Sequence, residues 1–491
     1  MGAAALVPLT ANAFCGFDAG KADASLFDEE SQVVMVRNGH RRVLSMLNDY
    51  SGPLSEFTLI VPTPTVLTEG QVRVAEKTTF ERLDAYSSPR LAEYQDTDPC
   101  QMNFNWGQQL YPRLLGAPSA AGAMRSEAKM MKDKALGVTV EEYNIVSLSA
   151  TQSEGLETWL RVNGYEIPKS ASAALKPYIN QGVKFFMAKV NFKEQTRLGY
   201  GTLRPLQFAF ESEKFMLPMR LGMLNAPPNT PQNFIVYLLT KNGCVESSNN
   251  GTAKLAANEN LPPFFKAKFK YFYKALYDTS TAREDYRAVF TEYFWDMGWC
   301  DPCVSDPLSA VELRKAAVFW VGGEDAGNMA PAAVGIPGIV QRRTPMLSSR
   351  GGAQAVLLTR LHVQYTANTF PEDLMFTQTK DRQNWQSRYV IQNRYASGVA
   401  ACSEETGKAD CEAMCSSAVS EVQSAIKNHR SDSYPLPKDY RNKSSAELRN
   451  DCAKNCSDSK RTAVVAAAKY YERDLPERLA REKQTLAKLT G

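Results

Sequence analysis

The stretch QVVMVRNGHRRVLSM, residues 32–46, decides the fold. Two apolar, β-rich runs flank Asn38-Gly39, the pair best suited to the positive φ angles of a tight hairpin turn. Other strand-like runs lie at residues 57–61, 183–192, 206–210, 234–239, 356–365 and 389–392. Because strands occur at both ends of the first 395 residues, the late strands must join the early ones. We therefore expect an α+β fold: a sheet-centred domain with inserted helices.

Two capping boxes predict helices within this domain. Thr281 with Glu284 precedes apolar residues at helical spacing that continue to Met297, so we expect a helix there. Ser309 with Glu312 opens a second predicted helix, which runs to residue 320. The segment 322–352 is rich in Gly, Pro and Ala and is typical of a long surface loop.

The aromatic and basic segment 264–277 has two interpretations. Stacking rings between lysines are typical of nucleic-acid or glycan contact. However, Phe265, Phe269, Phe272 and Leu276 recur at helical spacing. This favours a helix with an apolar face toward the core and lysines toward solvent.

The composition excludes several classes of protein. The chain has 491 residues, 44% of them hydrophobic and 22% charged, so it is neither disordered nor of low complexity. With 57 basic and 53 acidic residues, the net charge of +4 is too small to indicate nucleic acid as a partner. Only 3 histidines are present, which disfavours a His-rich metal site. We find no nucleophile elbow, zinc-protease, P-loop or dinucleotide-binding motif, and no cofactor or metal is indicated.

The N-terminus and the cysteines indicate export. Residues 1–13 contain a short apolar run ending in Ala11-Asn12-Ala13, which is typical of a signal-peptide cleavage site, although no basic residue precedes it. The chain has 10 cysteines, an even number that favours disulfides in an exported protein. No later stretch is long and apolar enough for a membrane span. We expect a periplasmic or extracellular protein with its mature domain at residues 14–395.

Residues 396–491 form a second predicted unit, a cysteine-rich helical tail. Cys411 and Cys415, and likewise Cys452 and Cys456, lie one helical turn apart. Two antiparallel helices would join Cys411 to Cys456 and Cys415 to Cys452, an arrangement similar to twin-CX3C hairpins. A four-thiolate zinc site is the alternative. Between residues 427 and 488, lysine and arginine exceed acidic residues by 15 to 9, which indicates either a solvated helical face or a surface for a protein or envelope partner.

Trp299-Cys300-Asp301-Pro302-Cys303 is the sharpest chemical motif. It resembles the WCxPC site of thioredoxin-like oxidoreductases, which implies Cys300 as the nucleophile and Cys303 as the resolving thiol. The helix expected before it disfavours this reading, since that motif follows a strand. A turn locked by a Cys300–Cys303 disulfide is the other interpretation. We also expect Cys15 to pair with Cys100, and leave Cys244 and Cys402 unassigned.

Asp96-Thr97-Asp98 is a short acidic motif with two readings. It is either a fragment of a calcium site or a solvated loop, and the latter is favoured because no longer ligand series follows.

Several motifs together resemble one family. They are Cys15-Gly16-Phe17, Lys21-Ala22-Asp23-Ala24, Asn48-Asp49-Tyr50, Ile60-Val61-Pro62-Thr63-Pro64, the WCDPC motif, Thr359-Arg360-Leu361-His362-Val363 and Phe370-Pro371-Glu372-Asp373-Leu374. This set is similar to the secreted bacterial family called domain of unknown function 2330, over residues 14–394. The resemblance implies export and implies no activity. We thus predict a non-catalytic binding or scaffold module, with a thiol-disulfide oxidoreductase as the alternative.

Overall fold

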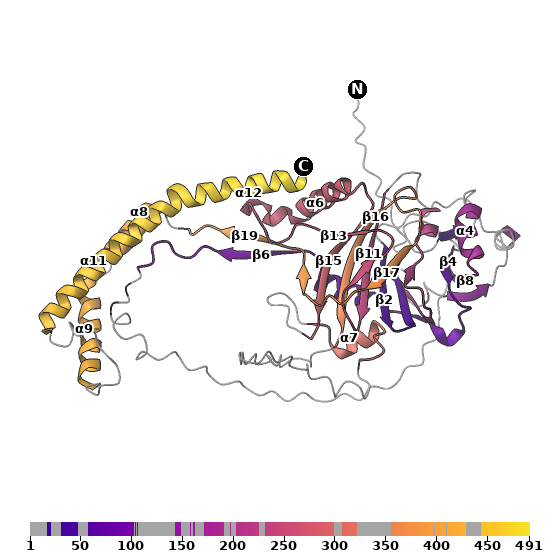
Figure 1. Cartoon of the computed structure of the whole chain (residues 1–491), viewed down its shortest axis with the longest axis horizontal. Helices are drawn as coiled ribbons and strands as arrows, with labels where there is room; N and C mark the ends of the chain where they lie inside the picture. The colour runs from indigo at the N-terminus through magenta and orange to yellow at the C-terminus, as the bar shows by residue number, and fades with distance from the viewer. Residues whose placement is uncertain are drawn as a thin grey trace, which may run out of the picture.

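A computed structural model describes residues 17–20, 31–47, 57–102, 104, 106, 143–148, 158, 161–162, 171–190, 197, 203–224, 231–298, 307–321, 355–396, 398–408, 410–428 and 443–491. The predicted signal peptide, the 322–352 segment, Cys15 and the WCDPC motif lie outside these residues. Figure 1 shows a sheet-rich body from which a long helical arm extends.

The body is built on a nine-stranded sheet in which late strands join early ones, as predicted. Its strand order is β13 (Gly251–Lys254), β15 (Ala288–Asp296), β16 (Leu357–Tyr365), β11 (Gln232–Thr240), β2 (Ser31–Asn38), β3 (Arg41–Leu47), β9 (Leu206–Glu211) and β5 (Val72–Val74), with β18 (Trp385–Gln386) paired to β15. The β2–β3 hairpin is confirmed: Asn38 lies opposite Arg41, and Gly39 takes a φ of 63°. β2 also pairs in parallel with β11.

Three smaller sheets surround this one. One has the order β1 (Phe17–Gly20), β4 (Phe57–Thr63), β8 (Lys184–Val190) and β7 (Tyr143–Leu148). The second contains β10 (Met216–Leu217), β17 (Leu374–Gln378) and β12 (Val245–Ser247). The third contains β14 (Glu259–Leu261), β19 (Arg388–Asn393) and β6 (Arg90–Gln95).

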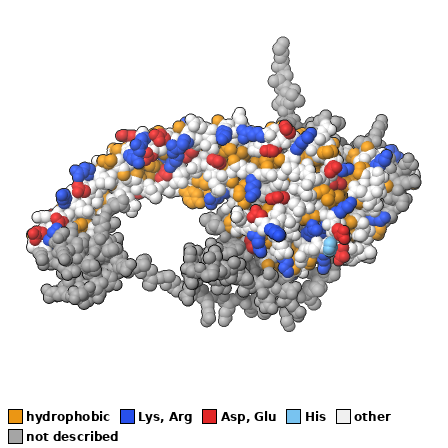
Figure 2. Space-filling model, in the orientation of Figure 1, with side chains coloured by type: hydrophobic (Ala, Val, Ile, Leu, Met, Phe, Trp, Pro, Cys, Tyr) orange, Lys and Arg blue, Asp and Glu red, His pale blue; other side chains and the backbone are white. Residues whose placement is uncertain are grey.

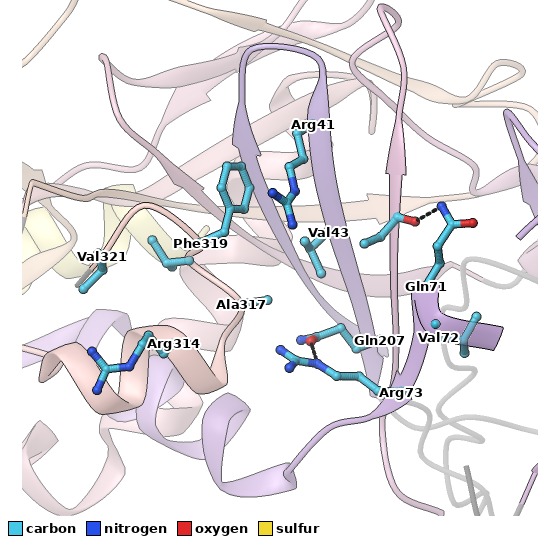
Figure 3. A pocket seen from close by; sticks show the side chains of 13 residues that line it. Arg41, Val43, Gln71, Val72, Arg73, Gln207, Arg314, Ala317, Phe319 and Val321 are labelled. Carbon is cyan, nitrogen blue, oxygen red and sulfur yellow. Dashed lines mark hydrogen bonds between the residues drawn. The ribbon is translucent and has the colours of Figure 1, made fainter. Parts of the chain in front are cut away.

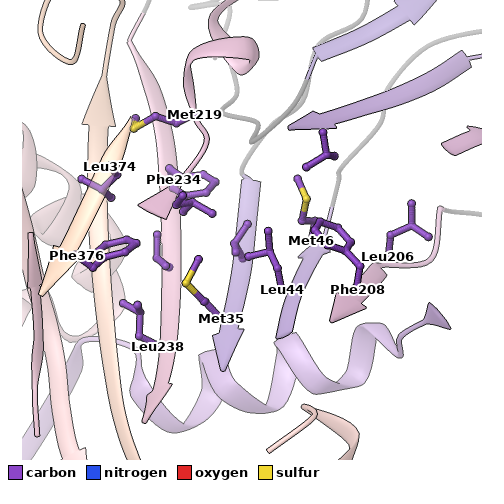
Figure 4. Packing of buried hydrophobic residues seen from close by; sticks show 14 of the residues in the cluster. Met35, Leu44, Met46, Leu206, Phe208, Met219, Phe234, Leu238, Leu374 and Phe376 are labelled. Carbon is purple, nitrogen blue, oxygen red and sulfur yellow. The ribbon is translucent and has the colours of Figure 1, made fainter. Parts of the chain in front are cut away.

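Both faces of the large sheet are buried, and β2 shows how. Val33 and Met35 point into the core shared with the four-stranded sheet, whereas Val34 and Val36 point into the core on the opposite face. This alternation follows from the two-residue period of a strand. Figure 4 shows the first core, in which residues of β2, β3, β9 and β11 pack together with Met219, Leu374 and Phe376.

Helices complete the layers. On the second face of the large sheet lie α1 (Lys77–Ser87) and α7 (Ala310–Lys315), and α4 (Ala171–Asn180) covers the outer face of the four-stranded sheet. α6 (Phe269–Arg283) packs on β14 and β19. Short 3₁₀ turns are η1 (Glu69–Gln71), η2 (Arg220–Leu224) and η3 (Pro263–Lys268). The core-facing reading of segment 264–277 is confirmed, because Phe272 and Leu276 are buried. The Ser309–Glu312 capping box is also confirmed, although its helix is shorter than predicted.

The helix predicted from Thr281 to Met297 is wrong. Thr281 lies in the last turn of α6, where its hydroxyl donates to the carbonyl oxygen of Tyr277 at 3.0 Å. Asp285 and Tyr286 then take positive φ angles of 52° and 55°, which end the helix. The apolar residues that follow form strand β15, whose side chains are buried on both faces of the sheet. A strand buried on both faces has no alternating pattern and resembles a helix in sequence.

The arm confirms the predicted disulfide-stapled helical hairpin. It contains α8 (Val399–Lys408), α9 (Cys411–Asn428), α11 (Ser445–Lys469), a π-helical turn η5 (Tyr470–Asp474) and α12 (Leu475–Thr490). Cys411 bonds to Cys456 and Cys415 to Cys452. Figure 2 shows basic and acidic side chains intermixed along the arm, which fits a solvated face. None of the described helices is long and apolar enough to cross a bilayer.

The division of the chain into two domains near residue 396 stays a prediction.

Two links near β6 attach the arm to the body. Cys100 forms a disulfide with Cys402, so the predicted pairing of Cys100 with Cys15 is wrong. No local pattern indicates this pair, because 302 residues separate the two cysteines. The side chain of Asp96, 9% exposed, accepts hydrogen bonds from Arg478 Nη1 at 2.7 and 2.9 Å. Asp96 is thus paired with an arginine of the arm rather than solvated, and Asp98 accepts a hydrogen bond from the Cys100 amide.

Candidate functional site

A basic pocket opens where the β3–β9–β5 edge of the large sheet meets α7 (Figure 3). Its volume is about 430 Å³, within the range of about 300 to 1,000 Å³ that is usual for small-molecule sites. Its lining residues are Arg41, Val43, Gly70, Gln71, Val72, Arg73, Gln207, Ala209, Arg314, Ala317, Val318, Phe319 and Val321. None of these described lining residues is acidic, and three are arginines.

Each arginine comes from a different element. Arg41 begins β3, Arg73 lies on β5 and Arg314 on α7, and all three are exposed to solvent. The Arg41 guanidinium lies over the Phe319 ring, 4.5 Å from its centroid. Within the described residues, Arg314 makes no side-chain hydrogen bond or ion pair. Figure 3 shows the side chains of Arg41 and Arg73 on the side of the pocket formed by the sheet, whereas the Arg314 guanidinium points away from them along α7. No carboxylate is among the described lining residues.

A row of side chains across three strands positions Arg73. Gln207 lies opposite Ser45 on one side and opposite Arg73 on the other. Its amide donates to Ser45 Oγ at 2.6 Å, and its carbonyl oxygen accepts from Arg73 Nε. The enclosing protein lowers the pKa of Arg73 from its ordinary value, yet an arginine keeps its charge in proteins. The hydrogen bond to the neutral Gln207 thus holds the Arg73 side chain in place without neutralising its charge.

The end of α7 shapes the opposite wall. The Val318 amide donates to the Leu313 carbonyl at 2.8 Å, which closes the helix in the manner of a Schellman motif. This closure requires a left-handed residue, and Ala317 supplies it with a φ of 66°. An alanine there costs about 1 kcal/mol relative to glycine. The turn brings Phe319 under Arg41.

A second polar cluster is buried under α1 and α6, away from the pocket. Glu292 sits at a β-bulge of β15, where the register with β16 shifts between Thr291 and Tyr293. Its side chain is 1% exposed and accepts hydrogen bonds from Arg360 Nε at 2.6 Å and from the Tyr273 hydroxyl. His362 Nδ1 lies 2.7 Å from the other side of the carboxylate.

Its surroundings keep Glu292 ionised. Burial raises the pKa of Glu292, but the charges and hydrogen bonds of His362 and Arg360 outweigh burial and hold the pKa at about 2. Arg360 also binds Asp84 of α1 at 2.5 Å, and Tyr277 of α6 stacks on His362 at 3.8 Å. Both carboxylate oxygens of Glu292 are therefore occupied by the protein itself. This arrangement ties α1, α6, β15 and β16 together.

A family model described as an uncharacterized protein conserved in bacteria, domain of unknown function 2330, matches residues 9–377. The chain belongs to this family. No curated protein matches the chain, and neither does any solved structure. The matched range contains every pocket residue and the Glu292 cluster, whereas helices α8 to α12 of the arm follow it.

Two of the motifs shared with this family contribute side chains that bind other residues inside the body. Arg360 and His362 of the Thr359–Val363 motif bind Glu292. Asp373 of the Phe370–Leu374 motif is buried and accepts from the Tyr178 hydroxyl at 2.5 Å and the Met219 amide at 3.0 Å. Burial raises the pKa of Asp373. These motifs therefore hold elements of the body together.

The cysteines expected to carry chemistry are only partly described. Cys300 and Cys303 lie outside the described residues, so their disulfide and their predicted roles stay predictions. Cys244 is buried without a disulfide, and burial raises its pKa to about 11. A thiol with such a pKa is a poor nucleophile. Among the described residues, no group of three metal-binding side chains comes together.

Sequence reasoning missed the pocket entirely. Arg41, Arg73 and Arg314 are far apart in the chain and form no motif. The available signal was weak: Arg41 belongs to the hairpin that the sequence predicts, and Arg314 belongs to the helix that the Ser309–Glu312 capping box predicts. Only the strand order places β5 and β3 on either side of β9.

Proposed function

We propose that this protein is a non-catalytic extracytoplasmic binding module whose basic pocket holds a small anionic ligand. The observation that carries this proposal is that Arg41, Arg73 and Arg314 line one pocket of about 430 Å³, with no acidic residue among its described lining residues. A guanidinium presents several N–H donors in a planar fork that matches carboxylate and phosphate groups. An anion in this pocket would relieve the repulsion among the three charges.

The proposal of a binding role rather than catalysis rests on the residue types present. The described lining residues include no histidine, carboxylate, cysteine or hydroxyl that would serve as base or nucleophile. Glu292 and His362 have the right chemistry, but they hold each other and Arg360 in the interior.

An extracytoplasmic location is part of the same proposal. Three disulfides join described cysteines, and disulfides persist mainly in oxidising compartments. The expected signal peptide at residues 1–13 supports a periplasmic or extracellular location. In this setting the helical arm adds a surface for a protein or envelope partner.

Binding is tested by thermal unfolding of the full chain at constant ionic strength. Phosphate, sulfate and citrate are compared with chloride, for the wild type and for the double variant Arg41→Gln/Arg314→Gln. Anion binding to the folded state raises the midpoint. We expect a rise in the wild type that is lost in the double variant and kept in Arg449→Gln/Lys454→Gln, which removes two exposed charges from the arm. An equal rise in all three proteins would refute pocket binding.

A thiol-disulfide oxidoreductase is a second proposal, favoured by one observation. Strand β15 ends at Asp296, three residues before Trp299, so a strand precedes the WCDPC motif where a helix had been expected. The test is a redox titration of Cys300 and Cys303 by alkylation and mass spectrometry. A potential between roughly −270 and −120 mV supports redox work, and one below about −300 mV marks a structural disulfide.

A further inference from the structure

We infer that the ligand of the basic pocket is an amphipathic anion: a carboxylate or phosphate monoester with a small apolar body. This inference rests on the proposed function and specifies its ligand class. It follows from how donors, acceptors and apolar surface are distributed in the pocket.

The polar side chains of the pocket offer mostly hydrogen-bond donors. The side-chain acceptors among the described lining residues are the carbonyl oxygens of Gln71 and Gln207. Gln71 Oε1 accepts from the Thr68 amide and hydroxyl at 3.0 Å each, and Gln207 Oε1 accepts from Arg73. Gln71 Oε1 thus accepts two hydrogen bonds and Gln207 Oε1 one, so the side chains offer far fewer acceptor sites than donors, which suits an anion because an anion needs donors alone.

Some hydrogen-bond donors of the pocket already have acceptors within the protein, and others do not. Arg73 gives its Nε to Gln207, and Gln71 gives its amide to the Ala209 carbonyl at 3.0 Å. Arg41 and Arg314 have no hydrogen-bond partner for their guanidinium groups within the described residues. Arg41 therefore supplies most of the recognition of the anionic head and Arg73 supports it, while Arg314, whose guanidinium points away from both, adds positive charge at the α7 wall.

The remaining wall is apolar and rigid. Val43, Val318 and Val321 are buried members of the core between the large sheet and α7, and Val72 belongs to the core on the opposite face. Ala209, Ala317 and Phe319 complete the apolar lining. A fully hydrated inorganic ion would leave this surface in contact with water. An apolar body would cover it, and each buried methylene strengthens binding about fourfold.

The pocket size limits the body. About 430 Å³ suits a ligand with one ring or a short chain, and it is too small for a lipid with two acyl tails. A carboxylate head and a phosphate monoester head make the same demand on the guanidinium groups. The ligand class is therefore defined by an oxyanion head joined to a compact apolar group.

The test is a calorimetric titration of the full chain with matched probes. Benzoate and hexanoate are compared with acetate, and phenyl phosphate with inorganic phosphate, while benzyl alcohol tests the apolar body without charge. We expect benzoate and phenyl phosphate to bind at least ten times more tightly than acetate and phosphate, and benzyl alcohol to bind at least ten times more weakly than benzoate. Arg41→Gln/Arg314→Gln should weaken benzoate at least tenfold.

A substitution in the apolar wall separates binding of the apolar body from binding of the anionic head. Phe319→Ala should weaken benzoate at least fivefold and leave acetate within twofold; Val321→Thr, which keeps the side-chain volume, replaces it if the first variant unfolds. If the anions bind with arginine dependence but the apolar body adds nothing, the amphipathic ligand is refuted and the proposed function stands. If no anion binds, both are refuted.

Discussion

Glu292 Oε2 lies 2.6 Å from Nε of Arg360, and both side chains are buried, with 1% and 8% of their surfaces exposed. Truncating one partner of such a buried pair leaves the other charge without compensation. Because the β-bulge at Glu292 aims this carboxylate at Arg360 and His362, the pair joins the centre of the large sheet to the helices above it.

We predict that Glu292→Gln lowers the free energy of unfolding by about 3 to 5 kcal/mol at neutral pH. The control is Glu213→Gln, which changes an exposed carboxylate and should have an effect within about 0.5 kcal/mol. Urea denaturation at pH 7 measures both. A loss below about 1 kcal/mol for Glu292→Gln would show that the cluster contributes little to stability.

The same carboxylate predicts a pH dependence. The pKa of Glu292 is about 2 in the folded protein and 4.5 ordinarily, so its contribution to stability is complete above pH 4.5 and is lost as the pH falls toward 2. The shift corresponds to about 3 kcal/mol. The stability difference between wild type and Glu292→Gln should therefore shrink between pH 4.5 and 2. A difference that stays constant over this range would contradict the pKa argument.

The Cys100–Cys402 disulfide closes a loop of 302 residues between the body and the arm. We predict that Cys100→Ser/Cys402→Ser lowers the free energy of unfolding by about 2 to 5 kcal/mol. Peptide mapping without reduction should recover a Cys100–Cys402 cross-link. Cys244 is the internal control, because its buried thiol should react with iodoacetamide only after unfolding. Recovery of a Cys15–Cys100 peptide would overturn the assignment.

Arg478 fixes α12 to β6 through Asp96, and it also lies 3.4 Å from the buried Glu482. We predict that Arg478→Met raises amide hydrogen exchange at least tenfold in α12, because two carboxylates then lose their shared cation. Arg473→Met is the matched control, since Arg473 is exposed and contacts only Asp474 among the described residues. Equal exchange in both variants would mean that apolar contacts of α12 with α6 hold the arm alone.

Ala317 predicts a stabilising substitution at the pocket wall. Its φ of 66° favours glycine, so Ala317→Gly should raise the free energy of unfolding by about 1 kcal/mol. Ala310→Gly, in the first turn of the same helix, should lower it by about 0.5 to 1 kcal/mol. Thermal unfolding of the two variants gives the sign. Destabilisation by both would show that Ala317 does not take the left-handed conformation.

Sequence patterns correctly predicted the elements that depend on interactions between residues close together in the chain. Asn38-Gly39 has the turn geometry of the hairpin, and Ser309 with Glu312 caps α7 as expected. The two CX3C pairs also specify their own partners, because a helix places thiols four residues apart on one face.

The failures share a non-local cause. Strand β15 is buried on both faces, so its sequence carries a continuous apolar run that also fits a helix. Cys100 lies next to Cys402, and Arg41, Arg73 and Arg314 line one pocket, only because the tertiary fold brings distant segments together. Spacing along the chain contains no information about such meetings.

The decisive measurement is the affinity of benzoate for the wild type and for Arg41→Gln/Arg314→Gln, with Arg449→Gln/Lys454→Gln as the charge-matched control. The proposed pocket predicts saturable one-to-one binding that weakens at least tenfold in the first variant and changes less than twofold in the control. Each charge-assisted hydrogen bond contributes about 1.5 to 3 kcal/mol, which is enough for this change. Equal affinity in all three proteins, or no binding to the wild type, would contradict an anion-binding role for the pocket.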